Sequence, residues 1–298
     1  MKAIIFHLTL LFLRLKGYKK MFSHDPMLYE AFRKDDVFEA PKKLLKAFQV
    51  RNFQVAESKV TEVLPKNGSS DYLVLFIHGG AMVAGPGKHH WDSMGYMVKK
   101  TGVKFWLMNY PKAPEHKITQ IAQNVDAVYA EARKTHAPSQ IFLMGDSAGG
   151  NLILTLTQRL IKNGEEPPKA IIPITPAVDV TFTNEAIDLL DSRDPILSKK
   201  GVTSTAHMSS GGVDLADPMM SPINGSFEKF PKTLMFLAGR DILYPDAKVA
   251  AYEMKKAGVP LEVVEETRMI HIWPLMPVMR EAKAALNKIC DFIRQNSR

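Results

Sequence analysis

The sequence predicts an α/β fold, in which a mostly parallel central sheet is flanked by helices. Two patterns indicate it: short apolar segments of strand length recur along the chain, and longer amphipathic segments separate them. A strand that is covered on both faces is apolar throughout, and alternation of strands with helices is typical of a parallel sheet. The expected strands are residues 72–77, 103–108, 141–144, 170–174, 234–238 and 261–264.

The segments between these strands have apolar residues at helical spacing. Residues 118–134 place Ile121, Val125, Val128 and Ala132 on one face, as expected of a helix that packs against a sheet. Further helices are expected at residues 152–161 and 247–256.

Two stretches depart from this alternation. Residues 53–63 predict an earlier strand pair, antiparallel and at the edge of the sheet. Residues 182–230 contain short helical pieces followed by the turn signals Asp217-Pro218 and Ser221-Pro222. We interpret residues 182–230 as an insertion on the carboxyl side of the sheet, and we expect one domain with a lid rather than two domains.

Composition excludes several classes of protein. The chain has 298 residues, of which 46% are hydrophobic and 23% charged, so it is not a disordered chain, a collagen or a coiled coil. The single cysteine, Cys290, excludes a disulfide within the chain and any cysteine-based zinc or iron–sulfur site.

The net charge of +8 is confined to the two ends. Residues 1–20 hold five basic residues and no acidic one, and residues 280–298 hold five basic and two acidic ones, which together account for the whole excess. The remaining body is neutral, so the sequence predicts no nucleic-acid partner.

Residues 1–20 begin with an apolar run at 3–13 that is followed by basic residues. The run is too short for a bilayer span, which needs about 20 residues, and no small-x-small cleavage site follows it. We expect an amphipathic helix docked on its own domain. Weak contact with a membrane surface and an uncleaved export signal are the alternatives.

Gly145-Asp146-Ser147-Ala148-Gly149 is the strongest functional motif. It lies between an expected strand and an expected helix, which is the setting of a G-x-S-x-G nucleophile elbow. Such a turn is strained and lifts the serine oxygen above the sheet, while the helix amino terminus favours developing negative charge. We therefore predict Ser147 as a nucleophile.

His78-Gly79-Gly80-Ala81 follows the expected strand at 72–77. One interpretation is an oxyanion hole, in which backbone N–H groups of Gly79, Gly80 and Ala81 act with that of Ala148. The other is a tight turn in which the glycines serve geometry alone.

A nucleophilic serine needs a base and an acid, which in hydrolases with this elbow follow it in the order acid, then histidine. His271 and His207 are the histidines after Ser147, and we predict His271 as the base because it follows the last expected strand. Asp241 ends a buried strand and is the predicted acid, in preference to Asp246. The pair His89-His90 lacks a third ligand at metal-site spacing, so no metal is predicted.

These motifs together resemble the hormone-sensitive-lipase family of α/β-hydrolases, in its microbial carboxylesterase branch. The resemblance runs from about Tyr72 to the carboxyl terminus. The matching segments are His78-Gly79-Gly80-Ala81 with His90, residues 110–116, residues 145–152, Thr175-Pro176 with Asp179, residues 217–222, and the region from Gly239 to His271.

The resemblance implies an α/β-hydrolase fold with a helical cap. It implies cap helices at residues 1–50, a first core segment at 51–181, a cap insertion at 182–230 and a second core segment at 231–298. It also implies oxyanion donors at Gly80 and Ala81 with Ala148. Four residues depart from the family motifs: Ala81 and Arg268 stand where glycine is usual, and Pro111 and Lys112 stand where arginine and leucine are.

The predicted function is that of a serine carboxylesterase, which hydrolyses short- to medium-chain carboxylic esters through an acyl-enzyme. A deacetylase, amidase or lactonase on the same triad and a membrane-surface lipase are the alternatives. No cofactor is predicted, the expected partner is a small-molecule ester, and the expected location is cytoplasmic with or without peripheral membrane contact.

Overall fold

The computed structural model describes residues 2–68, 70–276 and 279–297, and the side chains of residues 5–68 within the first range. The segments expected at residues 1–50, 51–181 and 231–298 therefore include positions outside the described residues, namely Met1, Ser69, Pro277, Val278 and Arg298. Eight strands form one sheet in the order β1-β2-β4-β3-β5-β6-β7-β8. They are β1 (Gln49–Val55), β2 (Ser58–Leu64), β3 (Leu73–Ile77), β4 (Lys104–Asn109), β5 (Ile141–Asp146), β6 (Ala170–Ile174), β7 (Lys232–Ala238) and β8 (Leu261–Glu266).

The strand pairing confirms the predicted mostly parallel sheet. β3 to β8 pair in parallel, whereas β2 is antiparallel to both β1 and β4, and β1 lies at the edge. The strand pair expected at residues 53–63 is thus present at the edge, and it begins four residues earlier, at Gln49.

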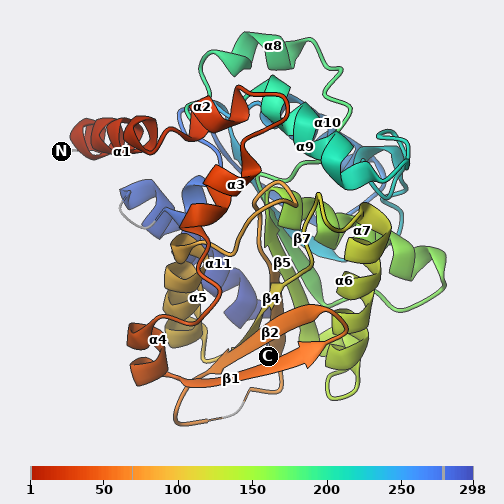
Figure 1. Ribbon diagram of the computed structural model, residues 1–298. Coiled ribbons are helices and arrows are strands. Elements are labelled where there is room, and N and C mark those ends of the chain that lie inside the picture. Colours follow the sequence, from red (N-terminus) through yellow and green to blue (C-terminus); the bar gives the residue numbers. More distant parts are fainter. Residues whose placement is uncertain (1, 69, 277–278, 298) are drawn as a thin grey trace.

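Helices cover both faces of the sheet (Figure 1). α6 and α7 share one hydrophobic core with alternate residues of the strands, such as Leu73 and Leu75, and α10 joins the same core. α5 and α11 share the opposite core with Val74 and Phe76.

The α-helices are α1 (Lys2–Lys16), α2 (Tyr18–Phe22), α3 (Tyr29–Phe32), α4 (Lys42–Ala47), α5 (Lys88–Thr101), α6 (Ile118–Arg133), α7 (Ala148–Lys162), α8 (Ala186–Asp191), α9 (Lys199–Ser210), α10 (Tyr244–Lys256) and α11 (Arg280–Asn296). Short 3₁₀ helices are η1 (Arg33–Asp35), η2 (Pro138–Gln140), η3 (Pro222–Asn224) and η4 (Trp273–Leu275).

Helices from two distant parts of the sequence gather beyond the carboxyl ends of the parallel strands. α1, α2 and α3 come from the amino-terminal segment, and α8 and α9 come from the stretch between β6 and β7 (Figure 1). α2 contacts α9, so the two segments pack on one another. Among the described residues, no helix is both long and apolar enough to cross a membrane.

Candidate active site

The serine elbow is built as the motif predicts. Ser147 follows β5 directly, precedes α7, and has φ 52° and ψ −119°, a strained conformation for a residue with a side chain. A Cβ on Gly145 would overlap the backbone of Gly149, and one on Gly149 would overlap the carbonyl oxygen of Ile77. The two glycines are therefore needed because strand and helix approach too closely for any side chain.

His271 and Asp241 meet at the same edge of the sheet. Asp241 follows β7 and His271 follows β8, and His271 Nδ1 lies 2.6 Å from Asp241 Oδ2. Asp241 Oδ1 accepts a hydrogen bond of 2.9 Å from the backbone N–H of Leu243, which fixes the carboxylate. Both side chains are buried, and His271 lines the same pocket as Ser147.

The electrostatic surroundings favour the protonated form of His271. Burial by itself lowers the pKa of the imidazole, but the negative charge and hydrogen bond of Asp241 outweigh it and raise the pKa above its ordinary value. A base held in this way can accept a proton during a reaction and remain stabilised as an imidazolium.

The alternative residues lie elsewhere. Asp246 lies in the first turn of α10, where its Oδ1 accepts a hydrogen bond of 2.7 Å from the side chain of Asn184. His207 is exposed on α9. Neither faces the pocket that Ser147 and His271 line.

Asp194 is a buried carboxylate beside this pair that the sequence interpretation missed. Its Oδ1 accepts backbone N–H groups of Ile196 at 2.8 Å and Leu197 at 2.9 Å, and its Oδ2 accepts that of Ile242 at 3.0 Å. Burial, and then the nearby charge of Asp241, raise the pKa of Asp194 to about 7. Asp194 thus ties the segment between α8 and α9 to the loop that carries Asp241.

The loop after β3 supplies amides near the serine, with one difference from expectation. The N–H of Gly79 donates to Asp146 Oδ1 at 3.1 Å, so Gly79 is not free to bind an oxyanion. The backbone hydrogen bonds of the described residues leave the N–H groups of Gly80 and Ala81 unused. Ala81 has φ 54°, a left-handed conformation that costs roughly 1–2 kcal/mol where the family motif has glycine.

His90 and Asp146 hold this loop against the elbow. His90 Nδ1 accepts the N–H of Gly87 at 2.9 Å, so Nε2 carries a proton, and this atom lies 3.1 Å from Asp146 Oδ1. Although burial raises the pKa of Asp146, the attraction of His90 lowers it to about 2.

The same hydrogen bonds involve two of three residues that could together hold a metal ion. Ligand atoms of His89, His90 and Asp146 lie within 4.8 Å of one another. Because both ring nitrogens of His90 are used within the protein, His90 has no free lone pair for a metal ion. The absence of a metal cofactor stays a prediction.

A second attachment of the loop comes from the amino-terminal segment. Arg33 donates to the carbonyl oxygen of Val83 at 2.6 Å and to Ala113 at 2.7 Å, and it pairs with both carboxylate oxygens of Glu115. Asp36 Oδ1 accepts the N–H of Gly85 at 2.7 Å. Pro111 stands where the family motif has arginine. The glutamate of that motif, Glu115, is instead bound by Arg33 of the amino-terminal segment.

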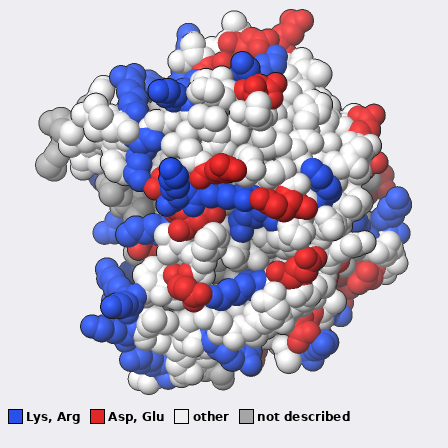
Figure 2. Space-filling model, in the orientation of Figure 1, with Lys and Arg blue, Asp and Glu red and all other residues white. Residues whose placement is uncertain are grey.

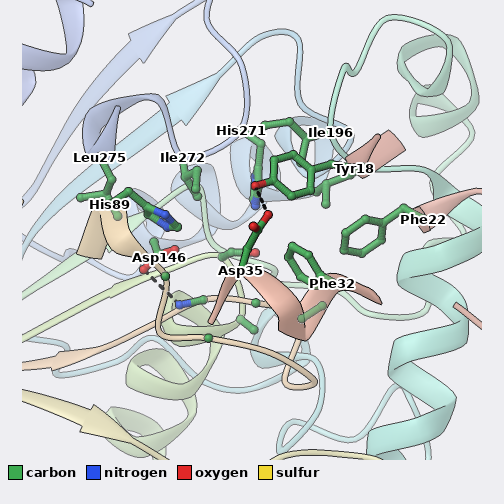
Figure 3. Close-up of a pocket in the computed structure, with 18 of the residues that line it drawn as sticks. Tyr18, Phe22, Phe32, Asp35, His89, Asp146, Ile196, His271, Ile272 and Leu275 are labelled. Atoms are coloured by element: carbon green, nitrogen blue, oxygen red, sulfur yellow. Dashed lines mark hydrogen bonds between the residues drawn. The ribbon is translucent and has the colours of Figure 1, made fainter. Parts of the chain in front are cut away.

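Ser147, Ala148, Gly80, Ala81 and His271 line one cavity of about 940 Å³. Its walls come from the sheet edge and from two capping segments, namely the amino-terminal one with α1 to α3 and the one between β6 and β7 with α8 and α9 (Figure 3). Asp241 lies behind His271 and does not line the cavity. The arrangement has the parts needed for acyl transfer: a serine that lines the cavity, a histidine oriented by a carboxylate, and backbone N–H groups at a helix amino terminus.

Comparisons with known proteins agree with this architecture. A family model described as alpha/beta hydrolase fold matches residues 74–275. An esterase from Acinetobacter venetianus is 28% identical over 247 residues, which cover 82% of this chain and 81% of that protein.

Solved structures extend the likeness over the cap. The crystal structure of an esterase from the bacterial hormone-sensitive lipase family has a TM-score of 0.87 at 25% identity and covers 100% of both chains. EstE5, in a crystal soaked with p-nitrophenyl butyrate, has a TM-score of 0.81 at 26% identity and covers 90% of this chain and 91% of its own. The predicted resemblance to the hormone-sensitive-lipase family is thereby confirmed, and the chain belongs to the α/β-hydrolase fold family.

Proposed function

We propose that the protein is a serine carboxylesterase in which Ser147 is the nucleophile, His271 the base and Asp241 the acid that orients it. The observation that supports this most strongly is the 2.6 Å bond between His271 Nδ1 and Asp241 Oδ2, at the pocket that the strained Ser147 also lines. The esterases among its relatives support an ester rather than another acyl substrate.

The reaction proceeds by two acyl transfers. Ser147 Oγ attacks the ester carbonyl carbon while His271 Nε2 takes the hydroxyl proton, and the resulting oxyanion accepts hydrogen bonds from backbone N–H groups. We assign that role to Gly80, Ala81 and Ala148, and not to Gly79, whose N–H is bound to Asp146. His271 then gives the proton to the leaving alcohol. Water repeats the sequence on the acyl-enzyme and releases the acid.

The test is hydrolysis of p-nitrophenyl butyrate by wild type and Ser147→Ala. We expect the variant to lose turnover by about 10⁴-fold or more, because no other group supplies the nucleophile. Ser209→Ala is the matched control, since Ser209 lines the same pocket from α9 and its hydroxyl bonds only within the helix. Wild-type turnover by Ser147→Ala would contradict the assignment.

A membrane-surface activity is favoured by one observation on α1. Several exposed side chains of this helix are apolar, and Leu11 and Leu15 are 52% and 79% exposed. Residues 1–20 carry basic side chains and no acidic one, which suits an anionic lipid surface. Flotation with anionic liposomes should be lost in Leu11→Gln/Leu15→Gln if this contact forms, and equal flotation of wild type and variant would contradict it.

A cytoplasmic location, with this peripheral contact, is part of the proposal. It is supported by the single cysteine, Cys290, which is buried and unpaired and suits a reducing compartment. Cell fractionation with an antibody to the protein tests it.

A further inference from the structure

The active-site cavity is larger than a short ester requires. Its volume of about 940 Å³ lies near the top of the range of about 300–1,000 Å³ that is typical of ligand pockets. A methylene group takes about as much space as a liquid water molecule, roughly 30 Å³, so a laurate chain needs roughly 360 Å³. A long acyl chain therefore fits beside the reacting groups.

Part of the cavity wall near His271 is apolar. Figure 3 shows Phe22, Phe32 and Ile196 gathered on one side of the histidine. Phe22 and Ile196 are buried, and the rings of Phe22 and Phe32 pack edge to face at 5.4 Å. Contact of a chain with such a wall stabilises it by about 0.8 kcal/mol per methylene, which corresponds to about fourfold in affinity.

The polar groups on the same wall are already paired. Asp35 accepts hydrogen bonds of 2.7 Å from Lys16 on one carboxylate oxygen and from the hydroxyl of Tyr18 on the other. These bonds attach the end of α1 to η1. Because Asp35 and the tyrosine hydroxyl are hydrogen-bonded within the protein, Phe22, Phe32 and Ile196 are the side chains of this wall that an acyl chain can contact.

One side of the cavity mouth is apolar. Leu8 and Phe12 both line the cavity, yet they are 59% and 55% exposed, so they form part of its rim, whereas the exposed Lys34, Lys88 and Asp92 form another part. Leu11 and Leu15 on the same helix are exposed and do not line the cavity. α1 projects from the body (Figure 1), and Figure 2 shows a largely uncharged surface there with basic side chains where α1 meets α2.

We propose that the enzyme hydrolyses esters of long acyl chains, of the length found in lipids, and that the chain passes Leu8 and Phe12 to lie against Phe22 and Phe32. This inference rests on the proposed function, and it extends the acyl range beyond the short to medium chains that the family resemblance predicts. A long acyl chain in a lipid surface reaches the mouth of the cavity past Leu8 and Phe12 of α1.

The experiment compares kcat/KM for p-nitrophenyl butyrate and p-nitrophenyl laurate below their micelle concentrations, without lipid. Wild type should prefer laurate. Leu8→Gln/Phe12→Gln should lower the value for laurate by about tenfold or more, equivalent to about 1.4 kcal/mol, and should leave butyrate within about twofold. Leu11→Gln/Leu15→Gln is the matched control on the same helix and should retain the wild-type ratio.

Three results would overturn the inference: a wild type that prefers butyrate, an equal loss for both esters in Leu8→Gln/Phe12→Gln, or an equal loss of laurate activity in the control. All three leave the proposed function intact, because butyrate is still hydrolysed and Ser147→Ala still abolishes it. Failure of the wild type to hydrolyse either ester would instead reject the proposed function.

Discussion

Replacement of Asp194 by asparagine should make the stability of the protein less dependent on pH. Asp194 is 1% exposed and lies beside Asp241, and its pKa is raised to about 7. Asparagine has nearly the shape of the neutral acid and cannot ionise. The substitution also replaces one acceptor oxygen by an NH2 group that faces a backbone N–H, a cost that is the same at every pH, so only the pH-dependent part of the difference between the two proteins reports the charge.

The expected magnitude follows from the difference in proton binding between the two states. A group whose pKa is raised on folding stabilises the protein at low pH, and that contribution is lost as the pH rises through the folded-state value. Between pH 5 and about 7 the carboxyl group has lost its proton in the unfolded chain and keeps it in the folded chain. The free energy of unfolding therefore falls by about 1.4 kcal/mol per pH unit in this range. Wild type should thus lose about 2–3 kcal/mol more than Asp194→Asn between pH 5 and pH 8.

Urea denaturation of both proteins at pH 5 and pH 8 measures this difference. Asp188→Asn is the matched control, because Asp188 belongs to the same capping segment but is exposed and pairs with Lys199; it should follow wild type. The pH profile of kcat/KM adds a second readout, since loss of a neighbouring carboxylate should move its acidic limb to lower pH. A difference between wild type and Asp194→Asn that is equal at the two pH values would refute the reasoning.

Three further predictions concern the base, the oxyanion loop and the elbow. Because His271 must be neutral to act and its pKa is raised, kcat/KM of wild type should rise with pH through a value above 6.5, and a midpoint below it would contradict the pairing with Asp241. Arg33→Lys should lower kcat by about tenfold through the loss of charged hydrogen bonds worth about 1.5–3 kcal/mol, whereas Arg159→Lys, which alters an ion pair with Asp126, should not. Gly149→Ala should lower the unfolding free energy by about 3 kcal/mol, because its Cβ meets a backbone oxygen. Gly164→Ala, which has open space but φ 75°, should cost only about 1 kcal/mol, as unfolding by urea will show.

The sheet and the elbow could be predicted from the sequence because their causes are local. Uninterrupted apolar runs identify strands that are covered on both faces, and β3, β5 and β7 are buried at almost every position. Ser147 is recognisable because close packing requires glycine at fixed positions on either side of it. Chain order then left few histidines and acids to consider.

Asp194 could not be predicted because its role depends on contacts distant in the sequence. In the segment Ser192-Arg193-Asp194-Pro195 it is indistinguishable from an acidic residue of an ordinary surface turn. Ile242, its hydrogen-bond partner, is 48 residues away in the sequence. Only folding brings the two together, buries Asp194 and places it beside Asp241. The hydrogen bond of Gly79 could not be predicted for a similar reason, since its N–H donates to Asp146, which is 67 residues away.

The capping segments therefore do more than cover the pocket. Arg33 and Asp36 of the amino-terminal segment bind the loop of Gly80 and Ala81, and Asp194 of the other segment binds the loop of Asp241. If the whole cap moved away to admit a substrate, both loops would lose buried hydrogen bonds that keep the reacting groups in place. Only Leu13 of α1 is buried among its described side chains, and the hydrogen bonds just named come from Arg33, Asp36 and Asp194, which lie outside α1. Substrate entry by a movement of α1 alone therefore breaks none of these hydrogen bonds, and the reacting groups stay in place throughout.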